Sequence, residues 1–278
     1  IWWNFPVSDY VRDHLLMGPV YGNALDIKDE MEGFVSNPME HAEASKIALY
    51  SVADYAWNLS DYDSDLSWKR AIKDLMPQHA AYLETFAAHN SDLGANGHRF
   101  RREESVALQP ALEALLSTYE KQHIIDEDAW RQVNEECSKI VTASDILSVS
   151  QENQPFIAEI TPWLMQFKLV GQYGEAVLQM MRRAVTDKTG FETAYEHAKS
   201  LQLLMYKVDT SYNQNPYQPG IKSGSKLLLP TFYALFEASV GLYNQAYQAA
   251  LDTRAVYMPY TWNSDVPQLA ALPVLRKG

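Results

Sequence analysis

The stretch Gly33–Asn58, GFVSNPMEHAEASKIALYSVADYAWN, joins a short apolar run, a polar residue and a helix start in immediate succession. Its first four residues, GFVS, include aromatic and β-branched side chains and predict a short buried strand. The next four, NPME, form a helix-start signal, with Asn37 as N-cap, proline in the first turn and glutamate at the third position of a capping box. We expect this helix to run to about Trp57.

A second stretch of the same kind stands at the start of the sequence. Residues 1–3 predict another short buried strand, and Asn4 follows it directly, as Asn37 follows GFVS. Strand, polar residue and helix in this order are typical of a parallel α/β fold, and in a (β/α)₈ barrel the active site lies at the carboxyl ends of the strands. Asn4 and Asn37 would both lie at that edge. From spacing alone, a role for Asn37 as a helix cap and nothing more is favoured.

The rest of the sequence predicts helices. From about residue 105 onward, five segments carry apolar residues at helical spacing, and Thr161-Pro162 repeats the cap-and-proline start signal. Long helices joined by short loops indicate an antiparallel bundle. The expected helices cover residues 108–122, 126–150, 161–186, 191–212 and 225–251.

The charge balance argues against nucleic acid as a partner. The sequence has 23 Lys and Arg against 35 Asp and Glu, for a formal net charge of −12, and such an acidic chain is a poor polyanion binder. The short basic group of Arg99, Arg101 and Arg102 is followed at once by two glutamates, which favours salt bridges over a phosphate site. The most apolar segment, residues 227–251, is interrupted by proline, glutamate and glutamines, so we expect no transmembrane segment.

The sequence also lacks the patterns of common cofactor and metal sites. Asp61, Asp63 and Asp65 resemble the start of an EF-hand loop, but the glycine and glutamate required later are leucine and isoleucine. The seven histidines show no metal spacing, and neither a P-loop nor a serine-hydrolase elbow occurs. Cys137 lies on one apolar helix face and is expected in the core. We therefore expect no cofactor and no metal.

The first forty residues hold the remaining candidates, Trp2, Asn4, Asp9, Tyr10 and Asn37. Asparagine and aspartate side chains make directional hydrogen bonds to hydroxyls, and an indole can stack on the apolar face of a pyranose ring. These residue types suit a carbohydrate site. The alternative of core aromatics plus helix caps stays open, and the residues alone favour it.

Longer motifs show a resemblance to a known family. WWNFPVSDYVRDHLLMGPVYGN (2–23), GFVSNPMEHAEASKIALYSVADYAWN (33–58) and AAHNSDLGANGHRFRREES (87–105) resemble the end of the catalytic barrel in glycoside hydrolase family 84. This family contains bacterial β-N-acetylglucosaminidases, O-GlcNAcases and so-called hyaluronidases. EITPWLMQFKLVGQYGE (159–175) and NQNPYQPGIKS (213–223) extend the resemblance into the helical domain that follows the barrel.

The resemblance implies a fold and a division into domains. The fold is mainly α, with the last strands and helices of a (β/α)₈ barrel followed by an antiparallel α-helical bundle. Residues 1–100 would form the C-terminal part of the barrel, residues 101–257 the bundle, and residues 258–278 a tail or a linker.

Four residues would bind substrate if the resemblance holds. Asn4 matches the asparagine that ends the family's WWN strand, and Asp9 matches an aspartate that holds hydroxyls on the non-reducing edge of the GlcNAc ring. Asn37 matches a ring-hydroxyl or acetamido contact, and Trp2 a wall of the pocket. Asn37 would then be both helix cap and ligand.

The sequence departs from the family in its catalytic residues. The family uses substrate assistance, in which the 2-acetamido oxygen attacks the anomeric carbon while two consecutive aspartates handle the proton. No Asp-Asp pair occurs in this sequence, and only two of the eight strands of a barrel are visible. We therefore expect the aspartate pair upstream, no catalytic residue in this chain, and no activity of the chain alone.

The expected partners follow from the same resemblance. They are a GlcNAc-containing glycan or glycoprotein and the missing N-terminal part of the barrel, in a secreted or periplasmic protein. Two alternatives stay open: a helical interaction or structural module that packs through aromatic loops such as YNQNPY (212–217), and a GlcNAc-binding protein without catalysis. A half-barrel is expected to expose apolar strand edges and to aggregate.

Overall fold

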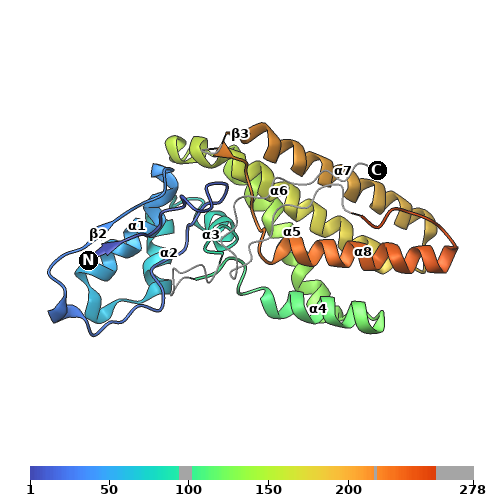
Figure 1. The fold of residues 1–278 in the computed structure, drawn as a ribbon, viewed down its shortest axis with the longest axis horizontal. Coiled ribbons are helices and arrows are strands. Elements are labelled where there is room, and N and C mark those ends of the chain that lie inside the picture. The colour runs from blue at the N-terminus through green and yellow to red at the C-terminus, as the bar shows by residue number, and fades with distance from the viewer. Residues whose placement is uncertain (94–101, 216–217, 255–278) are drawn as a thin grey trace.

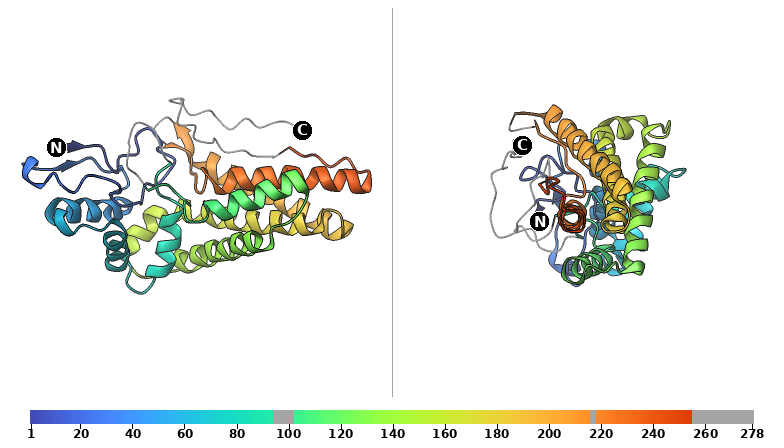
Figure 2. Two further views of the ribbon diagram at one scale, coloured as in Figure 1. Left: turned by 90° about the horizontal axis from the view of Figure 1, so that it is seen from below. Right: turned by 90° about the vertical axis from the view of Figure 1, so that its right-hand side faces the viewer.

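A computed structural model describes residues 1–93, 102–215 and 218–254 of the chain (Figure 1). The N-terminal part lies at one end, and the long helices α4 to α8 extend from it along the long axis (Figures 1 and 2). Arg99, Arg101, the end of the YNQNPY loop and the expected tail, 258–278, lie outside the described residues.

Two short parallel strands lie near the N-terminus. β1 (Trp2–Trp3) pairs with β2 (Val35–Ser36) in parallel, with Trp2 opposite Val35. The two predicted strands are confirmed, but the prediction that they are buried is wrong. Trp2 is 71% exposed and Val35 52% exposed, because in the described part of the chain neither strand pairs with a third.

Helix α1 (Ala42–Trp57) ends where the sequence predicted but begins later than its start signal. Asn37 is not its N-cap. The Asn37 backbone N–H donates to the Trp3 carbonyl at 2.9 Å, and the Asn37 carbonyl accepts from the Val7 N–H at 2.9 Å. Strand pairing therefore continues through Asn37 and delays the helix, so this residue cannot act as cap and ligand at once.

The N-terminus of α1 is capped from a distant helix. His41 precedes α1 and makes no side-chain cap. The carboxylate of Glu159, on helix α6 (Gln154–Arg183), accepts a hydrogen bond from the Ala44 N–H at 2.7 Å. Since the first N–H groups of a helix lack partners and carry partial positive charge, a carboxylate stabilises this end.

The other elements of the N-terminal part are short. They are η1 (Lys28–Glu30), η2 (Leu59–Asp61), α2 (Ser64–Leu75) and α3 (Ala80–Ala88). Asp63, one of the EF-hand-like aspartates, caps α2 by accepting from the Leu66 N–H at 2.8 Å. Arg102 pairs with Asp65 at 2.6 Å and lies over the Trp68 ring, which confirms the salt-bridge interpretation for this arginine.

The helical part is built around α6. Helix α6 packs against α5, α7 and α8, and α4 packs against α5 and α8 (Figure 2). The bounds of the other four helices are α4 (Gln109–Gln122), α5 (Glu127–Ser148), α7 (Lys188–Tyr212) and α8 (Leu228–Tyr247). A small antiparallel hairpin, β3 (Asn213–Asn215) and β4 (Gln218–Pro219), lies in the segment predicted as a loop.

Helix α6 corrects the prediction of a helix start at Thr161-Pro162. The helix begins at Gln154 and continues through Pro162. An interior proline removes one backbone hydrogen bond and costs about 3 kcal/mol or more. Buried residues on both sides of it, among them Ile160 and Trp163, pack against the neighbouring elements, and this burial outweighs the local cost.

One hydrophobic core joins the N-terminal part to the bundle. Leu15, Leu16 and Met17, from the loop after β1, belong to the same buried cluster as Phe167 of α6. Cys137 is buried in this cluster, as predicted. Within the described residues, none of the helices has the length and apolarity needed to span a membrane.

Candidate functional site

Two amide side chains meet at the carboxyl ends of the parallel strands. Asn4 follows β1 and Asn37 follows β2, so the strand register places them opposite each other. The Asn37 Nδ2 atom donates to the Asn4 Oδ1 atom at 3.2 Å, and the Trp2 Nε1 atom donates to the same oxygen at 2.9 Å. The structure thus brings together three of the four predicted site residues. We call this hydrogen-bonded set of Trp2, Asn4 and Asn37 the amide group.

The amide group is open to solvent. Trp2 and Asn4 are exposed, and Asn37 is half-buried. A primary amide carries two N–H donors and a carbonyl oxygen with two lone pairs. The bond to Asn4 uses one N–H of the Asn37 side chain, which leaves its carbonyl oxygen and second N–H for a ligand. Polar donors and acceptors beside an exposed indole suit a ligand with hydroxyl groups and an apolar face.

Asp9, the fourth predicted site residue, lies on the loop that leaves β1. The loop is fixed to β2 by the Val7–Asn37 backbone bond and by the Ser36 hydroxyl, which donates to the Phe5 carbonyl. Asp9 itself is exposed. Among the described residues, its carboxylate makes no hydrogen bond to the amide group, so the structure places it on the same loop without joining it to the other three. The carboxylate is therefore accessible from solvent.

A buried polar cluster follows this loop, and the sequence did not reveal it. The His14 Nδ1 atom lies 2.6 Å from Asp13 Oδ1, and its Nε2 atom lies 2.5 Å from Ser225 Oγ. The Lys222 ammonium lies 2.5 Å from Asp13 Oδ2 and 3.7 Å from Asp209 Oδ1 on α7. All five residues are buried. The adjacent Asp13 and His14, directly before the apolar residues 15–17, were the only local signal.

Charge pairing stabilises this cluster. Burial alone would raise the pKa of Asp13, but His14 and Lys222 hold that pKa well below its usual range. Burial lowers the pKa of Lys222, and Asp13 and Asp209 raise it by more. Asp13 and Lys222 are therefore both charged at neutral pH, and each compensates the burial of the other.

The contacts Ser225–His14–Asp13 have the order of a hydrolase triad. A nucleophilic serine must reach its substrate, and Ser225 has 0% of its surface exposed. Its hydroxyl satisfies a buried histidine and closes the network between the loop after β1 and the start of α8. The triad-like arrangement is therefore structural.

Glu104 is a further buried carboxyl beside this cluster. Its Oε1 atom accepts from the Lys226 N–H at 2.7 Å, while the neighbouring Glu103 pairs with the Lys226 ammonium. Burial raises the pKa of Glu104 to about 7, Asp92 adds to this effect, and His14 and Lys226 oppose it. Of these two adjacent glutamates, Glu104 is buried and Glu103 is half-buried.

Glu104 is expected to make stability depend on pH. Because its pKa of about 7 lies above the ordinary 4.5, the folded chain binds more protons than the unfolded chain between these values. The free energy of unfolding therefore falls as pH rises through this window. Glu104→Gln removes this titration. The difference in free energy of unfolding, variant minus wild type, should therefore increase by about 1–3 kcal/mol when the pH is raised from 4 to 8. Urea titrations of both proteins at pH 4 and at pH 8 measure this difference. A difference that decreases from pH 4 to pH 8 would refute the assignment.

Two family models match most of the chain. Residues 1–88, which include both strands and the amide group, match the model described as beta-N-acetylglucosaminidase. Residues 104–236 match the model described as the post-catalytic domain of bacterial GH84. The chain belongs to glycoside hydrolase family 84. The family predicted from the sequence motifs is thereby confirmed.

Solved structures of family 84 share the fold. The structure of CpGH84D is 28% identical with a TM-score of 0.73, and the match covers 87% of this chain and 40% of that one. CpGH84B is 22% identical with a TM-score of 0.74, and the match covers 84% of this chain and 39% of that one. A mutant of the Thermobaculum terrenum O-GlcNAc hydrolase is 21% identical with a TM-score of 0.66, and the match covers 89% of this chain and 50% of that one. The chain thus spans about two fifths to one half of the length of these proteins, and its mainly helical fold, a barrel end followed by a helical domain, is confirmed.

Proposed function

We propose that this chain forms the sugar-binding side of a retaining, substrate-assisted β-N-acetylglucosaminidase that removes terminal GlcNAc. The amide group carries the proposal. It lies at the carboxyl ends of parallel strands, where a (β/α)₈ barrel has its active site. It also lies inside the segment that matches the β-N-acetylglucosaminidase model. The substrate is a GlcNAc-containing glycan or glycoprotein.

Each proposed site residue has a role that fits its chemistry. The amides of Asn4 and Asn37 exchange hydrogen bonds with ring hydroxyls or with the acetamido group. The Asp9 carboxylate accepts from hydroxyls on the non-reducing edge of the ring, and its charge strengthens these bonds. Trp2 forms a wall against which the ring rests. Together they hold the sugar so that its acetamido oxygen can approach the anomeric carbon.

The proton transfers belong to residues outside this chain. In substrate-assisted hydrolysis a carboxylic acid protonates the leaving oxygen as the acetamido oxygen attacks, and a second carboxylate orients the acetamide. The 278-residue sequence contains no consecutive aspartates. We therefore assign general acid–base catalysis to the upstream part of the barrel and substrate binding to this chain.

A comparison of two polypeptides tests this division of labour. Full-length protein should hydrolyse an aryl N-acetyl-β-glucosaminide, and the isolated chain of residues 1–278 should release no aryl product above a buffer control. Specific turnover by the isolated chain would contradict the proposal. Full-length protein that binds GlcNAc without cleaving the aryl glycoside would instead support a sugar-binding protein without catalysis.

A further inference from the structure

The loop that carries Asp9 depends on distant contacts for its shape. Residues 4–19, all of them described, contain no helix or strand. At its start the loop is bound to β2 through the Val7–Asn37 backbone bond. Its other end needs a second attachment if Asp9 is to keep one position relative to the amide group.

Asp13 provides this second attachment. Its backbone carbonyl accepts from the Lys222 N–H at 2.9 Å and from the Trp163 Nε1 atom of α6 at 3.0 Å. Its carboxylate binds the Lys222 ammonium and the His14 ring. Lys222 therefore binds both the main chain and the side chain of Asp13, and Lys222 and Trp163 both come from the helical part.

Lys222 is itself held in place. Asp209 on α7 lies 3.7 Å from its ammonium and accepts from the Ile221 N–H at 2.9 Å. Gly220 has a φ of +125°, and a Cβ at this position would lie 2.0 Å from Asp209 Oδ1. Only glycine lets the chain pass this close to the carboxylate. Lys222 is thus held to α7 by two contacts of Asp209, one to its ammonium and one to the backbone of the preceding residue.

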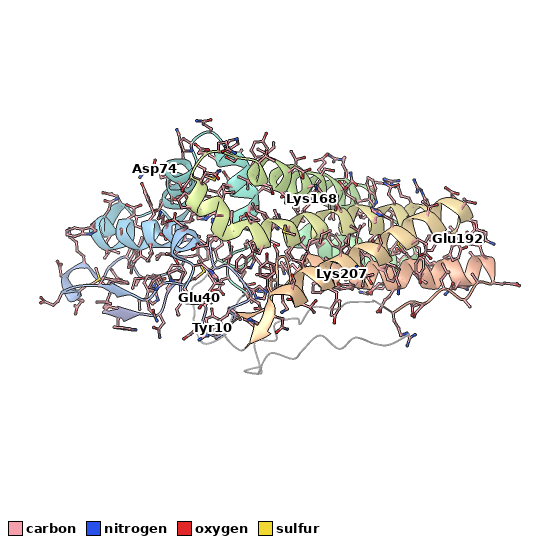
Figure 3. The ribbon with its side chains drawn as sticks, turned by 90° about the horizontal axis from the view of Figure 1, so that it is seen from above. Tyr10, Glu40, Asp74, Lys168, Glu192 and Lys207 are labelled. Atoms are coloured by element: carbon pink, nitrogen blue, oxygen red, sulfur yellow. The ribbon has the colours of Figure 1, made fainter. Side chains whose placement is uncertain are left out.

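The segment between Asp9 and Asp13 is short and internally bonded. The Val11 N–H donates to the Ser8 carbonyl at 2.9 Å, and the His14 N–H donates to the Val11 carbonyl at 2.9 Å. The Arg12 side chain donates to the Asp9 carbonyl at 3.3 Å. Because of these turns, a displacement of Asp13 is expected to displace Asp9 as well. Tyr10, between the two, lies beside the junction of the N-terminal and helical parts (Figure 3).

We propose that Lys222 is a positioning residue for the sugar site: by binding Asp13, it holds the Asp9 loop at the strand ends, so that the helical domain sets the geometry of sugar binding. This inference rests on the proposed function, because it requires Asp9 to contact the sugar. Lys222 itself touches no substrate. A shift of about 1 Å in a binding group can lower a rate about 100-fold, so the attachment need not move far to matter.

A double-mutant cycle between Lys222 and Asp9 tests the inference in the full-length enzyme. Lys222→Met keeps the length of the side chain and removes its charge. It should lower kcat/KM for an aryl N-acetyl-β-glucosaminide by about 10- to 100-fold. In an Asp9→Ala background the same substitution should change kcat/KM by less than about twofold, because residues that act through one contact are not additive.

Further variants separate positioning from loss of stability. Ser225→Ala removes the hydroxyl partner of His14 and is a milder change, for use if Lys222→Met fails to fold. It should lower kcat/KM in the wild-type background and leave it nearly unchanged in the Asp9→Ala background. Ser239→Ala removes a buried hydrogen bond to Tyr119, 3.2 Å long, between α8 and α4, and should leave kcat/KM unchanged. Losses from Lys222→Met and Ser225→Ala that add fully to that of Asp9→Ala would overturn the inference. An Asp9→Ala variant with wild-type kcat/KM would overturn the proposed function instead.

Discussion

Asp9→Ala is expected to lower kcat/KM of the full-length enzyme for an aryl N-acetyl-β-glucosaminide by about 30- to 1,000-fold, or about 2–4 kcal/mol of transition-state binding. The proposed bond joins a carboxylate to sugar hydroxyls that leave water when the sugar binds, and charged hydrogen bonds are the strong ones. Removing the carboxylate leaves those hydroxyls without a partner once water is excluded. Steady-state kinetics of the purified variant measures the effect.

A matched control distinguishes binding from general loss of negative charge. Asp74 on α2 is also exposed, and Figure 3 shows it on the far side of the molecule from Tyr10. Asp74→Ala should retain kcat/KM within about twofold. Equal kcat/KM for wild type and Asp9→Ala would remove Asp9 from the sugar site.

Lys222→Met is expected to lower the free energy of unfolding of the chain by about 3–5 kcal/mol. The substitution removes the cation shared by the buried carboxylates of Asp13 and Asp209, and taking one partner out of a buried ion pair is strongly destabilising. Urea unfolding followed by circular dichroism at neutral pH measures the change.

The control for this experiment is a lysine in solvent. Lys207 on α7 is exposed (Figure 3), and Lys207→Met should change the free energy of unfolding by no more than about 0.5 kcal/mol. The double variant Lys222→Met with Asp13→Asn should be more stable than Lys222→Met alone, since one of the two carboxylates that lost the ammonium is then uncharged. A loss below about 1 kcal/mol for Lys222→Met would show that the buried pair is not needed for stability.

The elements that rest on local signals were predictable. The apolar spacing predicted helices α4 and α5 nearly to their ends, and the structure shows that Asp126 caps α5. The order of strand and asparagine predicted that Asn4 and Asn37 lie at one sheet edge, and the parallel pairing of β1 and β2 brings them within hydrogen-bonding distance. Period and capping are properties of a few neighbouring residues, so the sequence contains them.

Tertiary contacts decided where local signals failed. The NPME signal predicted a cap at Asn37, but the pairing of its backbone with the β1 segment competes with helix formation. Glu159, far along the chain, then caps the helix that begins later. The Thr161-Pro162 pair predicted a helix start, but α6 continues through Pro162 because the side chains on both sides of the proline are buried. In both cases the deciding partner, the strand that pairs with Asn37 or the elements that bury the residues around Pro162, lies outside the few residues from which a helix start is predicted.

The buried cluster around Asp13 was beyond sequence reasoning for a similar reason. Its two halves lie more than 200 residues apart, at Asp13 and His14 and at Lys222 and Ser225. No spacing rule relates them, and a buried lysine looks in sequence like any surface lysine. Only the docking of the loop after β1 onto the helical part brings the charges together.

A crystal structure of the full-length protein with N-acetylglucosamine bound tests the central claim most directly. We predict that polar atoms of Asn4, Asp9 and Asn37 lie within about 2.6–3.2 Å of one sugar ring, with the Trp2 indole against it. A sugar bound away from the carboxyl ends of β1 and β2, touching none of these residues, would contradict the assignment.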